Sequence, residues 1–399
     1  MSDARSPKTI PRIAQSTISS MKLTCVLLII LLYLTWRGTL AQIDLGLYGA
    51  QKQYFESFFY LEQVGPLRVP LPGAQLVLIV LALNLLVGGL LRVRWRKRNV
   101  GVLIGHLGIQ MLLLAGFVKY TFSTEGAVKA YEGQSHAEFV SYHDWELVVG
   151  EPLPEGRIKE HLVPDEAFEA LGQGDRATFS SPQLPFQLEL SDYMVNAAVR
   201  KAGGSGTPTR PAVDGFYLEP MDPQIEVSYN QPGLYLRLEE SGATDGPGGS
   251  EQQGWIWGGQ REPLTLQVNG RPFTFDLRKQ RYPLGFEVRL DKFTKSEHPG
   301  TTMARDYRSK VTTRDAGVEQ TVEIMMNEPL RYKEFIFYQS GYGPQDPASR
   351  EPVYSVLSVV SNPSDQWPLW SCVVISFGLA LHFLLMLFRY TKNQLARAS

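Results

Sequence analysis

Residues 74–118 read AQLVLIVLALNLLVGGLL, then RVRWRKR, then NVGVLIGHLGIQMLLLAGFV. The two outer windows, Ala74–Leu91 and Asn99–Val118, carry no charged residue, whereas the seven residues Arg92–Arg98 between them include five cations. A helix needs about 20 predominantly apolar residues to cross a bilayer. The stretch therefore predicts two membrane-spanning helices joined by a short basic loop.

Two more uncharged windows lie near the ends of the chain. Trp367–Phe388 is long enough to span a bilayer and predicts a closing helix. Leu23–Trp36 is shorter, and it is either the centre of a first spanning helix over about 23–41 or the apolar region of a signal peptide, with Thr39–Ala41 as the cleavage site. We expect a retained helix, which gives three helices within 23–118 and a fourth over 367–388.

The charges between the windows are sorted by side. The segments 1–22, 92–98 and 389–399 together hold 12 Lys and Arg residues against one Asp. The long segment 119–366 holds 24 basic and 36 acidic residues, a net charge of −12. Because positive loops stay in the cytoplasm, we predict a cytoplasmic N-terminus (1–22), a cytoplasmic tail (389–399) and a large extracytoplasmic domain (119–366). The whole-chain charge of −1 excludes the basic surplus of nucleic-acid-binding proteins.

Four stretches of the segment 119–366 alternate between apolar and polar residues, which is typical of half-buried strands. They are Phe186–Leu190, Leu234–Leu238, Leu264–Val268 and Phe286–Leu290. The chain has only two cysteines, both outside this segment, so no disulfide framework holds the domain together. We predict an α+β membrane protein with four transmembrane helices and a β-rich domain built as an antiparallel sandwich or a pair of sheets.

The sequence contains no P-loop, no zinc-protease motif and no hydrolase nucleophile motif. Two histidines, His106 and His382, fall within predicted membrane helices, where ionisable residues are costly and mark functional sites. His106 follows Arg98 by eight residues, about 12 Å of helix, and His382 precedes Arg389 by seven, about 10 Å. Both are therefore expected in the inner half of the bilayer at similar depths, where two facing imidazoles could hold haem iron.

Three glycines, Gly101, Gly105 and Gly108, lie on the same predicted helix as His106. Their missing side chains would let either a flat macrocycle or another helix approach closely. The alternative for each histidine is a hydrogen bond to a neighbouring helix without any cofactor. The pattern leaves these interpretations open.

The segments Met326–Lys333 and Phe335–Tyr342 resemble the signature of the ResB-like cytochrome c biogenesis proteins, which reads approximately Asn-x-Pro-Leu-x-Tyr-x-Gly and then Phe-Tyr-Gln-Ser-Ser-Tyr. Glu334 stands where the family usually has Gly, and Gly341 where it often has Ser. The segment Gly105–Gly108, which contains His106, is similar to the family's third membrane segment. The matching signature positions are Asn327, Pro329, Leu330, Tyr332, Phe337, Tyr338, Gln339, Ser340 and Tyr342.

The resemblance implies a non-catalytic subunit of the system II complex, which moves haem across the bacterial inner membrane and assists its covalent attachment to apocytochromes c. It implies haem as a transient cofactor with His106 as an iron ligand, and contact of the helices with membrane lipid. His382 as a second ligand follows only from the depth comparison. The chain has no tryptophan-rich haem-binding stretch, so the resemblance implies a separate partner, a CcsA/ResC-type membrane protein. The alternative function is a membrane-anchored scaffold whose outer domain binds a partner without haem.

Overall fold

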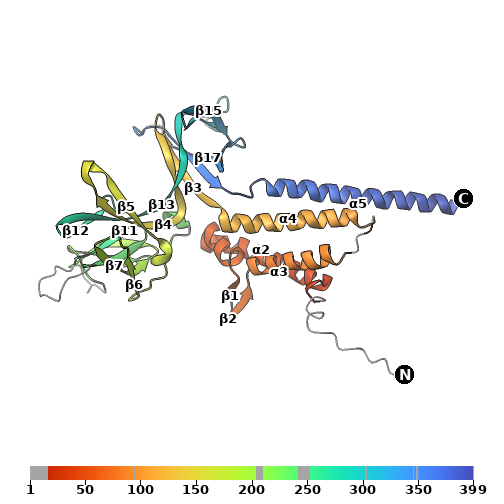
Figure 1. Cartoon of the computed structure of the whole chain (residues 1–399), viewed down its shortest axis with the longest axis horizontal. Helices are drawn as coiled ribbons and strands as arrows, with labels where there is room; N and C mark the ends of the chain where they lie inside the picture. Colours follow the sequence, from red (N-terminus) through yellow and green to blue (C-terminus); the bar gives the residue numbers. More distant parts are fainter. Residues whose placement is uncertain are drawn as a thin grey trace, which may run out of the picture. The chain divides into compact units, whose positions relative to one another are not determined.

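The computed structural model describes residues 17–398 except 94–95, 97, 204–209, 241–251, 302, 345 and 347–348. The chain forms two compact units, of which one is sheet-rich and spans Thr124–Val360. The other unit contains the helices before and after it. The predicted α+β class is confirmed, with helices in one unit and mostly antiparallel sheets in the other (Figure 1).

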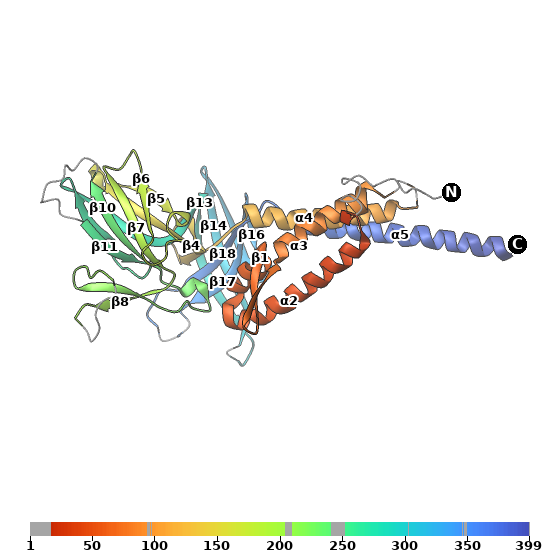
Figure 2. The same ribbon diagram turned by 90° about the horizontal axis from the view of Figure 1, so that it is seen from below.

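Four apolar helical segments form most of the helical unit (Figures 1 and 2). They are α2 (Met21–Ala50), continued by the π-helical turn η1 (Gln51–Phe55); α3 (Ala74–Asn84), continued by the π-helical turn η2 (Leu85–Leu91); α4 (Val100–Phe122); and α5 (Trp367–Ala398). All four are long and apolar enough to cross a membrane. The first extends past the expected 23–41, with a break at Gly46, whose φ of 69° lies outside the helical range.

A two-stranded hairpin, which the sequence pattern does not predict, connects the first two helices. Its strands are β1 (Phe59–Val64) and β2 (Leu67–Pro72), and they pair antiparallel. Tyr60 on the hairpin, Leu34 on α2 and Val77 on α3 belong to one small buried cluster. The hairpin is therefore a folded part of the helical unit.

Buried Asn84 connects α3 to the start of α2. Its Nδ2 donates to the backbone oxygens of Ile18 (2.5 Å) and Ser20 (3.2 Å), and its Oδ1 accepts from the Thr24 hydroxyl (2.7 Å). An amide inside an apolar helix is costly unless its polar atoms are bonded. These three hydrogen bonds therefore fix how α2 and α3 lie against each other.

Glycines allow α4 and α5 to pack closely. A methyl group added at Gly101 would lie 2.6 Å from the backbone nitrogen of His382, and one added at Gly378 would lie 2.5 Å from the backbone nitrogen of Gly105. A methyl group at Gly108 would meet the Ile375 side chain at 2.6 Å. Another helix, α5, thus occupies the glycine face of α4.

The close contact predicts different responses to alanine at two neighbouring glycines. Gly378→Ala places a methyl group against the backbone of α4 and is expected to destabilise the helix pair by about 1–3 kcal/mol. Gly105→Ala points its methyl group into open space, where no atom lies within 4 Å, and alanine is the better helix former. Thermal unfolding of the full chain in detergent measures both variants, and equal effects would contradict the observed packing.

The second unit is built from three sheets. A ten-stranded sheet has the order β15-β14-β13-β4-β3-β18-β17-β16, with β12 beside β13 and β5 beside β4; a four-stranded sheet has the order β11-β10-β7-β6; and β8 pairs with β9. The strands are β3 (Thr124–Tyr131), β4 (Ser135–Pro152), β5 (Ile158–Pro164), β6 (Arg176–Ser180), β7 (Phe186–Met194), β8 (Ala197–Lys201), β9 (Phe216–Pro220), β10 (Gly233–Glu240), β11 (Gln252–Trp257), β12 (Leu264–Val268), β13 (Arg271–Glu297), β14 (Ala304–Asp315), β15 (Val318–Met325), β16 (Leu330–Tyr332), β17 (Phe335–Gly343) and β18 (Tyr354–Ser361). All four predicted strand stretches lie in strands, namely β7, β10, β12 and β13.

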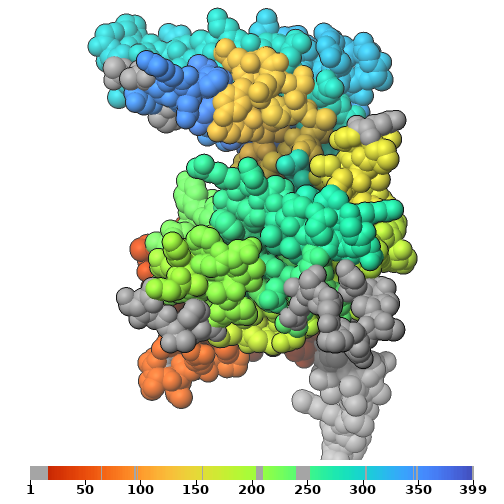
Figure 3. All heavy atoms as spheres, turned by 90° about the vertical axis from the view of Figure 1, so that its left-hand side faces the viewer, coloured from red at the N-terminus to blue at the C-terminus, as the bar shows by residue number. Residues whose placement is uncertain are grey.

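Two long strands, β4 and β13, pass through two separate hydrophobic cores. Leu147 and Phe275 lie in the core under the four-stranded sheet, whereas Phe139 and Val288 lie in the core formed with β14 to β18. Figure 3 shows the two resulting lobes of this unit, one coloured mainly gold, cyan and blue and the other mainly yellow and green. The long strands thus join the two lobes covalently and through their ladder.

Tight turns at loop positions set the register of two hairpins. Asn269 and Gly270, which connect β12 to β13, both have positive φ, at 52° and 75°. Ala316 and Gly317 connect β14 to β15 in the same way, at 46° and 85°. Two successive residues with positive φ match the right-handed twist of the flanking strands, so each turn fixes which residues pair across the hairpin.

A half-buried carboxyl in the sheet-rich unit predicts a pH-dependent stability. Burial, and then the neighbouring Glu166 carboxyl, raises the pKa of Asp165 to about 6. Because the folded chain binds this proton more tightly than the unfolded chain does, its stabilising contribution is complete below about pH 4 and is lost as the pH rises through about 6. Asp165→Asn is therefore expected to raise the unfolding free energy by about 1 kcal/mol at neutral pH, a value reduced for solvent screening. Urea unfolding at neutral pH and at about pH 4 tests this prediction. An equal gain in unfolding free energy at about pH 4 would contradict it.

Candidate functional site

His106 on α4 faces the end of η2. Its Nδ1–H donates to the backbone oxygen of Gly89 at 2.9 Å. The last carbonyls of a helix have no partner within the helix, so the imidazole satisfies one of them. Gly89 allows this approach, because a methyl group there would lie 2.8 Å from Nδ1.

The hydrogen bond determines what His106 can do chemically. A carbonyl oxygen only accepts, so Nδ1 carries the proton and the Nε2 of the neutral ring has a free lone pair. Histidines that bind metals usually donate their other ring N–H to a carbonyl or carboxylate in this way. With this arrangement, the Nε2 of His106 would be able to hold haem iron.

His382 on α5 lies in a different environment. Its backbone packs on Gly101, and its buried Nδ1 has no hydrogen-bond partner in the described part of the chain. Gly105 faces Gly378 in the same antiparallel pair, so the helix register places His106 level with Phe377. His382 is five residues further along α5, about 7.5 Å closer to the start of α4. The two histidines are thus not at the same level, contrary to the sequence-based estimate.

The two rings also lie in different directions. Gly101, Gly105 and Gly108 form the side of α4 that contacts α5. His106 is one residue past Gly105, which rotates it by about 100° around the helix axis, and it contacts η2 instead. The structure therefore gives His106 and His382 separate neighbours, and the Gly89 carbonyl, which the sequence pattern did not indicate, is the partner of His106.

The first half of the signature motif builds a turn in the sheet-rich unit. Met325 and Glu328 exchange two backbone hydrogen bonds of 3.1 Å, with Met326 and Asn327 between them. Asn327 has a φ of 72°, a left-handed conformation that asparagine tolerates better than most residues. Pro329 then leads into Leu330, which is buried in the core. These motif positions are explained by backbone geometry and packing.

The β16–β17 hairpin follows this turn. The Tyr332 hydroxyl donates to Asp315 Oδ2 (3.2 Å), and the Lys333 ammonium lies 2.7 Å from the same oxygen. Lys333 takes a left-handed φ of 52°, whereas Glu334 is not among the residues with positive φ. The departure from glycine at Glu334 is therefore accommodated without backbone strain.

Gln339 connects three strands of the ten-stranded sheet. Its Oε1 accepts from the Ser309 hydroxyl (2.6 Å), and its Nε2 donates to the Ser355 hydroxyl (3.0 Å) and to the backbone oxygen of Gly341 (2.7 Å). Ser309 and Ser355 are fully buried. A buried polar network is stable when each member is bonded, so Gln339 fixes the positions of β14, β17 and β18.

The remaining motif residues divide between core and surface. Phe337 is fully buried, and the Tyr342 ring stacks on Phe293 with centroids 5.2 Å apart. Tyr338 and Ser340 are exposed, and the Ser340 hydroxyl donates to the backbone oxygen of Val356 (2.9 Å). Most of the motif is therefore structural, and Tyr338 is its most accessible aromatic side chain.

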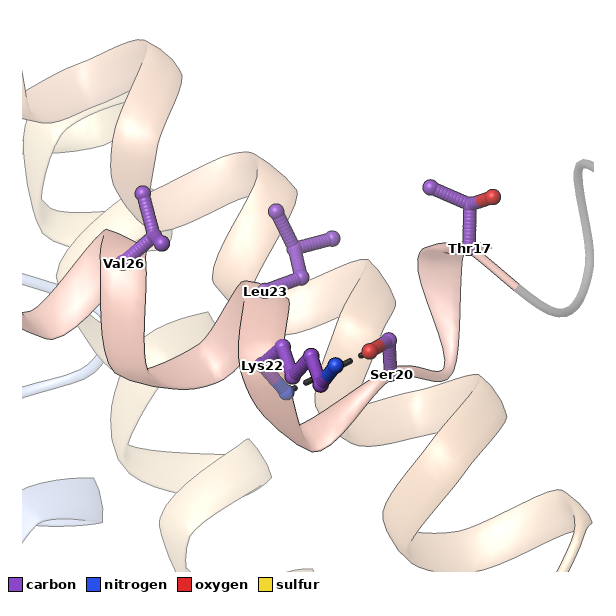
Figure 4. A pocket seen from close by; sticks show the side chains of 5 residues that line it. All are labelled: Thr17, Ser20, Lys22, Leu23 and Val26. Carbon is purple, nitrogen blue, oxygen red and sulfur yellow. Dashed lines mark hydrogen bonds between the residues drawn. The ribbon is translucent and has the colours of Figure 1, made fainter.

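Among the described residues, neither a surface hollow nor the distribution of metal-ligating side chains indicates a functional site as clearly as His106 does. An open hollow beside the first turn of α2 is lined by Thr17, Ser20, Lys22, Leu23 and Val26 (Figure 4). Ser20 Oγ accepts from the Lys22 backbone N–H (3.3 Å), so this serine caps the helix. The described residues contain no cluster of three or more His, Cys, Asp or Glu side chains that could hold a metal ion. His106 remains the residue whose geometry suits coordination of a metal ion.

Residues 240–353 match the ResB-like family. The matched range contains strands β11 to β17 and every signature position from Asn327 to Tyr342. No curated protein matches the chain. The family match confirms the resemblance predicted from the sequence and supports a role in cytochrome c biogenesis.

Proposed function

We propose that this chain is a non-catalytic subunit of a membrane complex that moves haem across the bilayer and assists its attachment to apocytochromes c. The observation that carries the proposal is the orientation of His106, whose Nδ1–H is bonded to Gly89 and whose Nε2 is free to coordinate iron. The separate partner in the complex is proposed to be a CcsA/ResC-type membrane protein, and the complex to lie in the bacterial inner membrane.

His106 supplies a binding step in this proposal. Haem is made inside the cell and used outside it, and its apolar faces suit a site among membrane helices. Coordination by the imidazole offsets the loss of water around the iron. His106 follows Arg98 by only eight residues, which places it toward the basic, cytoplasmic side of the membrane in the proposed orientation. Haem is thus captured near its source.

The outer domain is proposed to position the apocytochrome or the partner. Its net charge of −12 over 119–366 complements a basic protein. Raising the salt concentration is therefore expected to weaken apocytochrome c binding to the full chain severalfold, because salt screens exposed charges. Affinity measurements at low and high salt test this. An affinity independent of salt would contradict the proposal that charge contributes to binding.

The absorption spectrum of the full chain, purified from haem-replete membranes with and without its partner, tests the proposed function. The expected result is a Soret band in the chain alone, or a Soret band in the complex that weakens or shifts when His106 is replaced by alanine. A band that appears only with the partner and does not respond to His106 would overturn haem binding by this subunit. The chain would then be the scaffold of the alternative hypothesis, and the defect of a deletion strain would still be confined to c-type cytochromes.

A further inference from the structure

The β1–β2 hairpin has one buried and one exposed face. On the buried face, the Tyr60 ring lies 4.8 Å from the Tyr54 ring, and the buried Glu62 carboxylate accepts from the Arg37 guanidinium at 2.5 Å. Side chains alternate along a strand, so Phe59 and Leu61 lie on the opposite face, where they are 65% and 59% exposed. The ion pair and the ring contact hold the hairpin in place while this apolar face stays uncovered within the described residues of the helical unit.

The base of the hairpin is fixed directly to the start of α3. The Gly73 backbone N–H donates to the Phe58 oxygen (2.8 Å), and Gly73 leaves no room for a side chain against the backbone of Ser57. Phe59 is paired with Pro72, two residues before the first helical residue, Ala74. Phe58 and Phe59 therefore lie at the level of the first turn of α3.

The length of α3 fixes where this level lies in a bilayer. The span Ala74–Leu91 has 18 residues, which rise about 27 Å, against about 30 Å for the hydrocarbon core. Because the helix is no longer than the hydrocarbon core is thick, its first residue, Ala74, must lie at the boundary between hydrocarbon and headgroups. Phe58 and Phe59 then lie at the same boundary.

The direction of the hairpin keeps its other residues near this boundary. Figures 1 and 2 are related by a 90° turn about the long horizontal axis, and in both the hairpin runs across the direction of α3. Its strands are thus directed along the membrane surface and not away from it. Leu61 and the exposed Leu67 consequently stay close to the headgroup region as well.

We propose that the exposed face of the β1–β2 hairpin is a lipid-binding surface that rests in the headgroup and glycerol region of the leaflet next to the start of α3. Apolar and aromatic side chains of an amphipathic element bind this zone by leaving water while its backbone remains paired. The exposed Arg68, which pairs with Gln63 near the tip, adds a cation that suits lipid phosphates. The inference depends on α3 crossing the bilayer and not on haem binding.

Spin labelling of the full chain tests the proposal. Only Cys25 and Cys372 need replacement by alanine before a single nitroxide is attached at Phe59→Cys or Leu61→Cys. The labelled chain is reconstituted into vesicles of phosphatidylethanolamine and phosphatidylglycerol, and electron paramagnetic resonance measures collisions with oxygen, which concentrates in lipid, and with a water-soluble nickel chelate. Two exposed control positions are Leu83→Cys on α3 and Val318→Cys at the tip of the β14–β15 hairpin.

The expected result is more collision with oxygen and less with nickel at Phe59 and Leu61 than at Val318, with a depth shallower than that of Leu83. Nickel collisions equal to those of Val318 would overturn the proposal, because the hairpin would then stand in water. Low collision rates with both reagents would also overturn it, because the face would then be covered by protein, either the sheet-rich unit or a second chain. A water-exposed Leu83 would refute the premise that α3 spans.

Discussion

His106→Ala is expected to lower the amount of haem that co-purifies with the full chain by about tenfold or more. The substitution removes the Nε2 lone pair that the Gly89 hydrogen bond directs away from η2. Losing one coordinate bond costs more than the 1.4 kcal/mol that corresponds to a tenfold change in affinity. The Soret absorbance per mole of protein measures the loss, and externally added imidazole is expected to restore part of it.

Two matched variants separate a ligand from a packing residue. Gly89→Ala keeps the imidazole but moves it, since the new methyl group would lie 2.8 Å from Nδ1, so a shifted and weaker Soret band is expected. His382→Ala removes the other membrane imidazole, which contacts a different part of the bundle, and is expected to leave the band unchanged. A normal Soret band in His106→Ala would mean that His106 only donates a hydrogen bond to η2. A Soret band that is lost in this variant and is not restored by imidazole would mean the same.

The membrane segments and many strands could be predicted because their signal is local. An uncharged window of sufficient length has few alternatives, and each of the four alternating stretches in the sheet-rich unit lies in a strand. The β1–β2 hairpin was missed for a local reason too. Pro70 and Pro72 lower the strand signal, and the hairpin is held instead by distant contacts such as the Arg37–Glu62 pair.

Only part of the site could be predicted. The position of a histidine along its helix follows from the sequence, but the neighbour that its side chain faces depends on how the helices pack. The position of His106 in a helix can be counted from the sequence, but its Gly89 partner depends on how η2 lies against α4. The depth of His382 was estimated from the nearest arginine. The actual level is set by glycine contacts between α4 and α5, which no charge pattern reports.

The signature motif shows the same division. Its spacing identified the family, but the reason for each residue appears only with its neighbours. Gln339 is needed because it bonds two buried serines, Ser309 and Ser355, from strands far apart in the sequence. Gly341, where the family often has serine, has its nearest neighbouring atom, Val356 Cβ, at 3.4 Å, so the family's residue would fit there.

Arg278→Ala is expected to destabilise the sheet-rich unit far more than the loss of an exposed ion pair on the same strand. The Arg278 guanidinium donates through Nε to Glu146 (2.9 Å) and through both terminal nitrogens to Glu160 (2.9 and 2.6 Å). Glu146 is only 3% exposed. Removing the cation leaves this carboxylate buried without its charged partner, at a cost of about 3–5 kcal/mol. Urea unfolding of the full chain in detergent, followed by the circular dichroism of the sheets, measures it.

Arg281, three residues further along the same strand, provides the matched control. It pairs with Glu138 at a similar distance (2.8 Å), but both side chains are nearly half exposed. Arg281→Ala is therefore expected to cost less than about 1 kcal/mol, since water already solvates both charges. Adding Glu146→Gln to Arg278→Ala should recover part of the stability, because an uncharged amide is less costly to bury than a carboxylate. If Arg278→Ala costs no more than Arg281→Ala, the buried carboxylate does not depend on this pair, and the backbone ladder and the apolar contacts are enough to hold β4 and β13 together.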